Sequence, residues 1–553
     1  MTISPPCASR WPKCRPSSTG WVSNSFPAPD FSDQRQGPPV SKIRHALTVK
    51  REDDFAKWYQ EVIAAADMAE ESGVRGCMVI KPWGYGIWER IQRLLDDRIK
   101  ATGHDNCYFP IFIPLSNFER EAEHVEGFAK EMAVVTHHRL IAGEKGGLVP
   151  DPEARLEEPL VVRPTSETII GDAMARWVQS WRDLPLKLNQ WANVVRWEMR
   201  TRMFLRTSEF LWQEGHTAHA DEAEAKEHTL RMLEVYRACA EDDLALPVIA
   251  GEKPENERFP GAVETWSIEA MMQDGKALQA GTSHYLGTNF SEAAGIRYQD
   301  QGGEQQLCHT TSWGVSTRMV GGVIMAHGDD DGLRVPPAIA PYQVVILPML
   351  RGDEGDAALL SYCEDIEAGL AAQSALGENV RVLLDRKPGK AAAKRWDWVR
   401  KGAPLIVEVG PRDMDKGNVA LLRRDALWNA ETGKPAFRFV GRQEFVGMAA
   451  NEIEAIQRSL FDEAHERREA NIVRDIDDFD ALAAFYDSAK RYPGWVEVQW
   501  SRPTGAALDK VVEQLKSLKL TVRNVARDAE PADGACIFTG EPAVERIYVA
   551  RAY

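Results

Sequence analysis

The sequence lacks several features that would place it in a simple class. It has no run of about 18 consecutive apolar residues, which excludes a membrane-spanning helix. Its eight cysteines are scattered without a Cys-x-x-Cys pair, which disfavours a disulfide scaffold and a structural zinc site. It contains no Gly-x-x-x-x-Gly-Lys-Ser/Thr loop, no Gly-x-Gly-x-x-Gly turn and no Gly-x-Ser-x-Gly elbow. An enzyme with this sequence would therefore bind phosphate through side-chain cations.

The composition is that of an ordinary globular protein. Hydrophobic residues make up 44% and charged residues 27% of the 553, which excludes wholesale disorder and collagen-like repeats. At roughly 100–200 residues per domain, the length predicts three or four domains. The formal net charge of −16 argues against a basic surface over the whole protein, although an average of this kind can hide a basic face on one domain.

Composition and periodicity divide the chain into four parts. Residues 1–45 are rich in Pro and Ser without periodicity, so we expect a flexible leader, either a targeting segment or a misassigned start. Residues 46–337 contain strands that seldom alternate with helices, which predicts an α+β domain on an antiparallel sheet. Strands and helices alternate in 338–450, which predicts an α/β domain, and residues 451–553 predict a small α+β domain.

The spacing of apolar residues locates the individual elements. One helical stripe runs from Ile87 to Ile99 and another from Leu508 to Leu518. The other predicted helices are 222–241, 319–326 and 355–373. The predicted strands are 108–114, 160–163, 190–198, 207–216, 305–315, 344–350, 380–384, 405–409, 419–422, 496–500 and 546–551.

Four arginines within residues 196–206 could supply the missing phosphate-binding cations. In a strand, Arg196 and Glu198 share one face, where the arginine could bind a phosphate and the carboxylate could accept an exocyclic amine. Further along, alternate residues place aromatic, acidic and imidazole side chains on one face, namely Phe210, Trp212, Glu214 and His216. A solvated hairpin with surface ion pairs is an equal alternative on composition alone.

Two other segments have the residue types of a ligand site. In Arg163-Pro164-Thr165-Ser166-Glu167, Thr165 and Glu167 could together bind one ammonium group, although local evidence favours a helix N-cap at Thr165 or Ser166. Arg318 begins an apolar helix, where its charge opposes the helix dipole unless an anion binds there. His284, in Gly281-Thr282-Ser283-His284, is a weak candidate by itself.

In this order the segments resemble the three motifs of class II aminoacyl-tRNA synthetases. The first would be the helix and strand ending at Pro110 or Pro114, the second the arginine-rich segment, and the third the helix at Arg318. Five segments are similar to prolyl-tRNA synthetases of the eukaryote/archaeal-like type: GCMVIKP at 76–82, RPTSE at 163–167, FLWQEGH at 210–216, GTSH at 281–284 and HGDD at 327–330. The resemblance extends from about residue 50 to Tyr553.

This resemblance implies a fold, a reaction and a set of roles. The fold would be a class II antiparallel-sheet catalytic domain, an α/β anticodon-binding domain and a zinc-binding-like C-terminal domain. The enzyme would activate L-proline with ATP and Mg²⁺ and transfer it to the 3′ end of proline tRNA. The implied catalytic residues are Arg196 and Arg318. The implied proline-binding residues are Thr165, Glu167, Arg196, Trp212, Glu214, His216, Phe259, His284 and Ser316. The implied ATP-binding residues are Arg196, Glu198, Arg206, Thr207, Gln279, Thr282 and Arg318, with Ser316 completing the site.

A local excess of basic residues supports the anticodon-binding assignment. Residues 381–424 contain twelve Lys and Arg against five Asp and Glu, a net charge of +7 inside an acidic protein. Trp396 and Trp398 lie among them, which suits phosphate contacts and base stacking on an RNA loop. The expected contacts to anticodon bases are Lys401, Glu408 and Arg412. A merely solvated basic face is the alternative.

The sequence departs from the family pattern in two places. Cys536 alone stands where the family often has a four-cysteine zinc site, so we expect no zinc. The interval from His216 to Gln279 is too short for an editing insertion. By resemblance we expect a cytoplasmic homodimer without membrane attachment. We also expect the carboxylate of Tyr553 to dock inside the fold.

Two other interpretations fit the sequence less well. A seryl enzyme would need a long N-terminal coiled coil, and a threonyl enzyme a Cys/His zinc site in its active centre, and the sequence has neither. A non-catalytic RNA-binding paralogue would be favoured by loss of a motif arginine, but both Arg196 and Arg318 are present.

Overall fold

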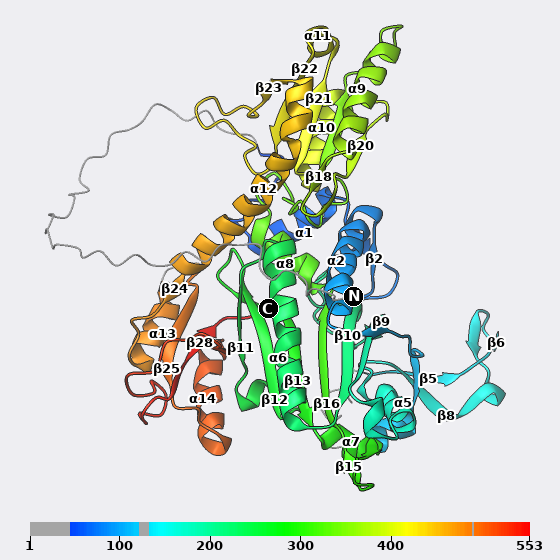
Figure 1. Ribbon diagram of the computed structural model, residues 1–553, viewed down its shortest axis with the longest axis vertical. Helices are drawn as coiled ribbons and strands as arrows, with labels where there is room; N and C mark the ends of the chain where they lie inside the picture. The colour runs from blue at the N-terminus through cyan, green and yellow to red at the C-terminus, as the bar shows by residue number, and fades with distance from the viewer. Residues whose placement is uncertain (1–44, 121–131, 489–491) are drawn as a thin grey trace, which may run out of the picture.

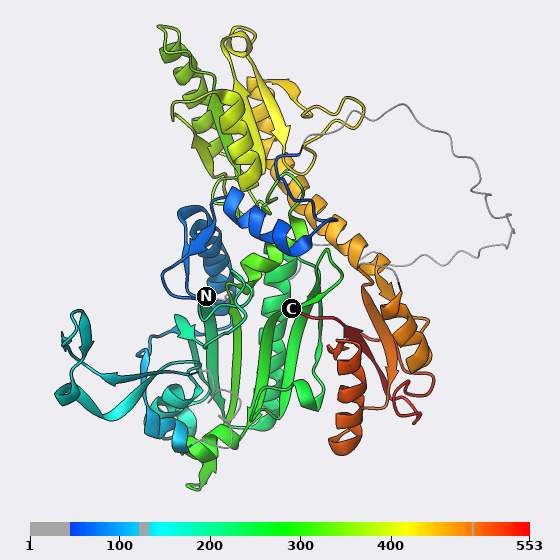
Figure 2. The same ribbon diagram turned by 180° about the vertical axis from the view of Figure 1, so that it is seen from behind.

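The structure is a computed structural model that describes residues 45–120, 132–488 and 492–553. The leader expected over 1–45 lies, except for its last residue, outside the described residues. The described chain forms a central domain around a large sheet, an α/β domain at one end, and a smaller domain beside the central one (Figures 1 and 2). In these three ranges no helix combines the length and the apolar character needed to cross a membrane.

The central domain is built on an eight-stranded sheet in the order β27-β11-β12-β13-β16-β10-β9-β3. Neighbouring strands are antiparallel except for β3 and β9, which confirms the predicted antiparallel sheet. The strands are β3 (Asp105–Asn106), β9 (Leu186–Val195), β10 (Glu209–His219), β11 (Val248–Glu252), β12 (Glu264–Met271), β13 (Ala277–Gly287), β16 (His309–Ser316) and β27 (Val525–Ala526). Because side chains alternate along each strand, the sheet has one face for helices and one for a ligand.

Helix α6 (Glu222–Ala238) covers the first face and packs on β13 and β16 (Figure 1). Asp221 caps the helix, since its carboxylate accepts a hydrogen bond from the Glu224 amide at 2.9 Å. The helix ends earlier than the predicted 222–241, and a π-helical turn occupies Cys239–Asp243. The other helices of this domain are α1 (Phe55–Ala65), α2 (Pro82–Lys100), α3 (Leu115–Arg120), α5 (Glu167–Trp177), α7 (Asn289–Ala294) and α8 (Arg318–His327).

Three histidines are buried between α6 and the sheet and form what we call the histidine cluster: His104, His219 and His228. The Nε2 atoms of His104 and His228 are 3.0 Å apart, and His219 Nδ1 lies 3.2 Å from a Glu224 carboxylate oxygen. Burial lowers the pKa of His104 to about 4 and of His228 to about 2, and it also lowers the pKa of His219. The cluster is therefore held in the neutral form.

The strand predicted over 190–198 ends earlier in the structure, and this changes the positions of two predicted site residues. Strand β9 ends at Val195, so Arg196 and Glu198 lie beyond it in the connection to β10. One hydrogen bond continues the pairing, from the Arg196 amide to the Ser208 carbonyl at 2.8 Å. Beyond Arg196 the chain turns into the loop, and the shared strand face expected for Arg196 and Glu198 is not formed.

Two other strand predictions were also too long. The segment 305–315 is divided, because β15 (Gln305–Leu307) pairs with β14 (Arg297–Gln299) in a separate hairpin before β16 begins. The segment 108–114 is extended only at β4 (Phe112–Pro114). The helices predicted at 87–99 and 319–326 are confirmed by α2 and α8.

A small sheet and a hairpin project from the central domain (Figure 1). The sheet has the order β4-β8-β5, with β5 at Ala133–His137 and β8 at Arg155–Val162, and the hairpin joins β6 (Leu140–Ala142) to β7 (Leu148–Pro150). Their exposed apolar side chains form what we call the apolar arm: Phe112, Val134, Leu140, Ile141, Leu148 and Val149. A hydrophobic surface of this kind on a hairpin is typical of a protein contact.

The α/β domain, which we call the module, contains a five-stranded sheet in the order β20-β17-β21-β22-β23. The strands β20, β17 and β21 are parallel and the other pairs are antiparallel. Its elements are β17 (Val344–Pro348), α9 (Asp356–Ala371), β18 (Ser374–Ala375), β19 (Glu378–Asn379), β20 (Val382–Leu384), α10 (Ala391–Lys401), β21 (Leu405–Val409), α11 (Pro411–Asp415), β22 (Asn418–Arg423) and β23 (Arg438–Gly441).

Helix α12 (Arg442–Ala470) leads from the module to the C-terminal domain without interruption, so the boundary expected at 450 falls inside a helix. On the way it contacts the central domain, where Arg334 makes two hydrogen bonds of 2.8 Å to Glu463. The C-terminal sheet has the order β24-β25-β28-β26. Its elements are β24 (Ile472–Val473), α13 (Phe479–Asp487), β25 (Trp495–Trp500), α14 (Gly505–Ser517), β26 (Thr521–Val522) and β28 (Glu545–Ala550).

Candidate active site

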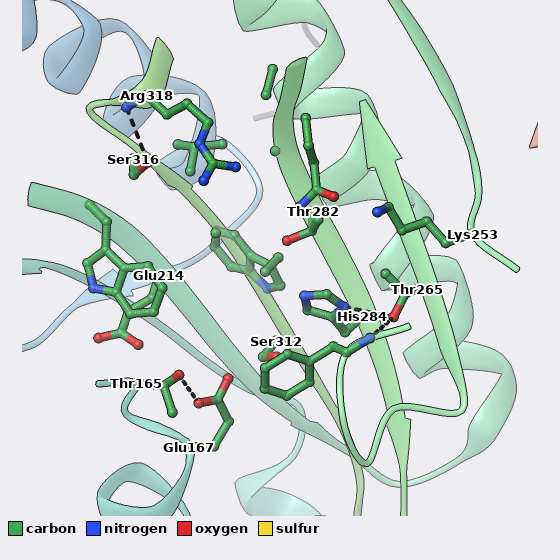
Figure 3. A pocket seen from close by; sticks show the side chains of 18 of the residues that line it. Thr165, Glu167, Glu214, Lys253, Thr265, Thr282, His284, Ser312, Ser316 and Arg318 are labelled. Carbon is green, nitrogen blue, oxygen red and sulfur yellow. Dashed lines mark hydrogen bonds between the residues drawn. The ribbon is translucent and has the colours of Figure 1, made fainter. Parts of the chain in front are cut away.

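The open face of the large sheet forms the floor of a cavity of about 230 Å³ (Figure 3). Strand register arranges this floor in two rows. One row runs Glu214, Gly314, Thr282 across β10, β16 and β13, and the next runs His216, Ser312, His284, Thr265 across β10, β16, β13 and β12. The two rows are two residues apart along each strand, so their side chains point to the same face.

Two ionisable side chains of the floor, Glu214 and His216, are buried beside each other. Glu214 accepts hydrogen bonds from Ser166 Oγ at 2.6 Å and Gln190 Nε2 at 2.7 Å, and its other oxygen lies 3.1 Å from His216 Nε2. Burial opposes ionisation of Glu214, but hydrogen bonds led by His216 hold its pKa below the usual value. Burial likewise opposes the charge on His216, but its hydrogen bond to Glu214 raises the pKa. The two form a buried ion pair.

The Thr165–Glu167 segment differs from the N-cap expected on local evidence. Ser166 occupies the N-cap position of α5, but its side chain makes no capping hydrogen bond and its hydroxyl instead donates to Glu214. The Thr165 hydroxyl donates to the Glu167 carboxylate, and both side chains line the cavity (Figure 3). A hydroxyl and a carboxylate side by side at a cavity wall are suitable partners for an ammonium group.

The structure brings Arg196 and Arg318 together in the same cavity. Arg196 donates from Nε to the Pro164 carbonyl at 2.8 Å, and its guanidinium carbon lies 5.5 Å from the centre of the Trp212 ring. Arg318 is the first residue of α8, and its Nε lies 3.3 Å from the Leu205 carbonyl. Burial lowers the pKa of Arg318 to about 10, and the nearby positive charge of Arg196 contributes. Two cations held this close favour an anionic ligand.

Three predicted ATP-binding residues are not in the cavity lining: Glu198, Arg206 and Thr207. Glu198 and Arg206 instead pair with each other in the loop between β9 and β10, at 2.7 Å. Thr207 is buried at the base of that loop. Arg206 nevertheless lies near enough to Arg318 to help lower its pKa, so this loop borders the cavity.

The far wall of the cavity is aromatic. The rings of Phe259 and His284 are 4.8 Å apart and tilted by 33°. His284 Nδ1 lies 3.0 Å from the Thr265 hydroxyl, which also accepts a hydrogen bond from the Phe259 amide. Burial lowers the pKa of His284 to about 3, so this ring is neutral. Gln279, Thr282 and Ser316 complete the predicted residues that line the cavity.

The cavity also contains residues that sequence reasoning missed. Lys253 and Arg258 bring positive charge, while Ser312 and Thr265 complete the second row of the floor. The Ser312 hydroxyl is buried and, among the described residues, has no hydrogen-bond partner. Ser312 and Thr265 become predictable only when the register of β16 and β12 is known. No sequence pattern indicated Lys253 as a binding residue, because a single lysine after a strand is common.

The structure does not bring the three predicted anticodon contacts together. Glu408 is buried in β21 and pairs with Arg395 at 2.8 Å, and burial raises its pKa. Arg412 is exposed in α11, beyond the C-terminal end of β21. Lys401 ends α10 at the opposite edge, where its carbonyl accepts a hydrogen bond from Trp83 of the central domain at 3.0 Å. Lys401 therefore belongs to the domain junction.

The other side chains of the basic segment also divide into two groups. Trp398 is buried and donates to Asp385 at 3.0 Å, so it cannot stack on an RNA base as expected. Seven of the twelve cations are in ion pairs: Arg381, Arg386, Lys394, Arg395, Arg400, Arg423 and Arg424. Exposed cations without a carboxylate within 4.0 Å among the described residues are Lys387, Lys390, Arg412 and Lys416. These four follow β20 and β21 at the C-terminal edge of the parallel strands, which we call the basic edge.

Comparison with known proteins gives two family matches and close relatives. Residues 151–327 match the tRNA synthetase class II core domain (G, H, P, S and T), and residues 343–434 match the anticodon binding domain. The chain is 76% identical over 514 residues to the proline–tRNA ligase of Erythrobacter litoralis, covering 93% of this chain and 100% of that protein. It is 71% identical over 511 residues to the proline–tRNA ligase of Novosphingobium aromaticivorans, covering 92% and 99%. The crystal structure of prolyl-tRNA synthetase from Cryptosporidium parvum with halofuginone and AMPPNP superposes with a TM-score of 0.81 at 35% identity, covering 92% of this chain and 97% of that one.

Proposed function

The chain belongs to the proline–tRNA ligase family, class II synthetases that activate L-proline with ATP and attach it to tRNA, and from this premise we propose how its cavity performs the activation. Two substrates must meet with the proline carboxylate beside the α-phosphate. This step needs alignment and positive charge more than a proton carrier, because a carboxylate is already a nucleophile.

The proline subsite lies between Thr165, Glu167 and the aromatic wall. The hydroxyl of Thr165 and the carboxylate of Glu167 bind the charged imino group of proline. Its ring contacts Phe259, Trp212 and His284, which leave an apolar space between polar groups. The buried pair of Glu214 and His216, with Ser316 further along the wall, fixes these side chains. A ligand with a small ring and a secondary ammonium fits this arrangement.

The nucleotide subsite lies toward the two arginines. Arg196 bridges the proline carboxylate and the α-phosphate, while Arg318 binds the phosphates at the start of α8, where the helix dipole adds to its charge. Gln279, Thr282 and Ser316 contact the nucleotide from the floor. Glu198, Arg206 and Thr207 contact it from the adjoining loop. During attack on the α-phosphate, the two guanidinium groups stabilise the charge that develops on its oxygens.

A Mg²⁺ ion accompanies the nucleotide in this proposal. Within the described ranges, no group of three His, Cys, Asp or Glu side chains is placed to hold a metal. The ion would therefore be bound mainly by the phosphates of ATP, which matches the usual preference of Mg²⁺ for phosphate and water oxygens. Its charge would add to that of the two arginines.

The observation that carries this proposal is the meeting of Arg196 and Arg318 in one cavity with Thr165 and Glu167. Proline-dependent exchange of pyrophosphate into ATP tests it. We expect exchange with proline well above that with any other amino acid, and exchange that is lost in Glu167→Ala. Exchange that is equally fast without added proline, or unaffected by that substitution, would refute the assignment of the proline subsite.

The module is the part of the chain that would select the tRNA. We propose that the anticodon contacts the basic edge, since its four cations have no carboxylate partners among the described residues. Helix α11, which carries Arg412, lies at the end of the module away from the central domain (Figure 1). Arg412 remains a candidate contact. Glu408 acts through Arg395, which it holds in place, rather than by direct contact. Exposed lysines and arginines on one edge suit an RNA backbone.

The apolar arm supports a homodimer. Leu148 is 71% exposed, and five other exposed apolar side chains lie on the same hairpin or on the small sheet, a surface that a second copy of the chain would bury. We expect sedimentation to give twice the chain mass. Leu148→Asp should shift the protein toward a monomer, whereas Val544→Asp, at an equally exposed site in the C-terminal domain, should not.

Three further features belong to the same proposal. Between His216 and Gln279 the chain forms α6, β11 and β12, all parts of the central domain, which supports an enzyme without an editing insertion. Cys536 has hydroxyl neighbours, Ser501 and Thr539, rather than thiols, which supports a C-terminal domain without zinc. We place the enzyme in the cytoplasm, where its tRNA and ATP are used. A metal assay of the purified protein tests the second point.

A further inference from the structure

The C-terminal domain completes the catalytic sheet through one short segment. After β26 the chain passes through Arg523 and Asn524 into β27, which pairs with β11 as the edge strand of the large sheet. Asn524 is fully buried and its Nδ2 donates to the Ile249 carbonyl at 3.0 Å. This segment therefore enters the central domain rather than resting on its surface.

Arg523 makes the one buried ion pair of that segment. Its Nη2 lies 2.7 Å and its Nε 3.3 Å from the same carboxylate oxygen of Glu269, and its Nη1 donates to Thr521 at 3.0 Å. Glu269 is wholly buried in β12, and its other oxygen accepts a hydrogen bond from Ser267 at 3.2 Å. Removing one partner of such a pair leaves a buried charge without compensation.

Lys253 lies on the other side of Glu269 and lines the active-site cavity (Figure 3). Its side chain is 4% exposed, and its two ion pairs are long, at 3.6 Å to Glu257 and 4.0 Å to Glu269. Burial lowers the pKa of Lys253, Glu269 and Glu257 raise it, and the charge of Arg523 lowers it. A buried ammonium group held this loosely can gain a partner from an anionic ligand.

The position of Arg523 explains why Lys253 is loosely held. One Glu269 oxygen is bound by Arg523 and the other by Ser267, so Lys253 shares this carboxylate with donors that lie closer to it. If Arg523 were neutral, the Glu269 carboxylate would attract the Lys253 ammonium and draw it out of the cavity. The same two charges reach Arg318, because Glu269 raises the pKa of Arg318 and Arg523 lowers it.

We propose that Lys253 is a further phosphate-binding residue of the activation site, and that Arg523 of the C-terminal domain positions it by occupying Glu269. The ligand is a phosphate group, either of ATP or of the pyrophosphate that leaves. This inference rests on the proposed nucleotide subsite, in which Arg318 binds phosphate. It gives the C-terminal domain a part in activation that needs no metal.

The test is proline-dependent ATP–pyrophosphate exchange with KM values for ATP, pyrophosphate and proline measured separately. For Lys253→Ala we expect a rise of about tenfold in the KM for ATP or for pyrophosphate, the size of one lost charge-assisted hydrogen bond, with the KM for proline within about twofold. The phosphate source is ATP if the KM for ATP rises and pyrophosphate if only that for pyrophosphate rises. Unchanged values for both would overturn the proposal.

Arg523→Gln should move the same KM in the same direction by a smaller factor, and Arg523→Lys should restore most of it. Because Arg523 acts through Lys253, the double variant should be no worse than Lys253→Ala alone. An additive loss, or an effect of Arg523→Gln on the KM for proline only, would refute the positioning role. If Arg523→Gln fails to fold, Arg523→Lys takes its place. Its KM values are compared with those of wild type, and those of Arg523→Lys with Lys253→Ala are compared with Lys253→Ala alone.

Arg474→Gln is the matched control, since Arg474 pairs with Glu469 and Glu497 away from the cavity. It removes an arginine ion pair from the same part of the chain and should leave all three KM values unchanged. Wild-type protein without exchange would refute the proposed function itself. Normal exchange by wild type with normal KM values in Lys253→Ala would refute only this inference.

Discussion

The two large sheets of this enzyme bury very different residues. In the module, every residue of β17 and β21 is buried, and Glu408 is the only charged one. In the central domain, the buried positions of β10, β12 and β16 include Glu214, His216, Glu269 and Ser312. The first sheet is stabilised by apolar burial, whereas the second places polar groups where water is excluded so that a ligand can meet them.

This difference predicts that substitutions in the two sheets have separable effects. A cavity residue that has few protein contacts of its own, such as Arg318, should lose activity more than stability when it is replaced. Apolar residues in the module contribute mainly to folding, so their loss should lower stability without changing the chemistry of the cavity. The following predictions test this separation from the largest expected effect to the smallest.

Arg318→Ala should give the largest change. We expect the rate of ATP–pyrophosphate exchange to fall by about 10²–10³-fold or more, because a preorganised cation is lost from the phosphate site. The midpoint of thermal unfolding should stay close to wild type, since Arg318 makes a single weak contact to the Leu205 carbonyl. Arg400→Gln, which breaks a surface ion pair with Asp397, is the control. A parallel loss of exchange and stability would contradict the separation.

Ile406→Ala should have the opposite effect, which is a loss of stability without a change in exchange kinetics. Ile406 is fully buried in β21, so its truncation should lower the free energy of unfolding by about 2–5 kcal/mol. At a temperature where the variant is folded, the exchange kinetics should match those of wild type. Phe439→Ala removes a larger side chain that is 67% exposed in the same sheet and should change stability by under about 0.5 kcal/mol. Urea unfolding measures both.

The histidine cluster should make the stability of the central domain depend on pH. His104 and His228 have folded pKa values of about 4 and about 2, below the value of about 6.5 expected when unfolded. Their contribution is therefore complete above about pH 6.5 and is lost as pH falls, by about 1.4 kcal/mol per pH unit for each histidine, toward the folded pKa. His219, Lys187, Arg231, Glu224 and Asp221 face the same cluster.

Urea unfolding between pH 5 and 6.5 measures this slope. His228→Gln should reduce it by about 1.4 kcal/mol per pH unit. An identical slope in wild type and His228→Gln would mean that the cluster is already protonated in the folded enzyme.

Arg412→Ala should give the smallest effect. We expect the KM for tRNA to rise a few-fold and the salt dependence of binding to weaken by about one unit of slope, as for one lost phosphate contact. ATP–pyrophosphate exchange should be unchanged, because Arg412 lies at the far end of the module. Lys434→Ala, at an exposed site on the loop between β22 and β23, should not alter tRNA binding. Equal effects of the two substitutions would argue against the basic edge.

The sequence predicted the fold and most cavity residues for identifiable reasons. Alternation along β10 placed Trp212, Glu214 and His216 on one face, and the unusual arginine at the start of α8 indicated an anion site. Ser312 and Thr265 could not be predicted, because their position depends on which strands pair and in what register. The place of Lys401 at a domain junction could not be foreseen, because a local net charge does not reveal which cations are paired or lie at such a junction.

Capping shows a second limit of local reasoning. Ser166 occupies the N-cap position that the sequence favours, yet its hydroxyl turns to a carboxylate that is far away in the chain. Glu214 is buried and ionised, so it needs hydrogen-bond donors, and Ser166 Oγ is one of the two that bind the same carboxylate oxygen. Local propensity therefore predicted the backbone correctly and the side chain incorrectly.

Helix α12 has a consequence for how the enzyme handles a long substrate. Its 29 residues correspond to about 43 Å of rigid rod that begins in the module and ends at the C-terminal domain. Gln457 and Glu463 bind this helix to the central domain, so all three domains are joined along its length. A tRNA that reached both the basic edge and the cavity would therefore meet domains whose spacing is set by one helix.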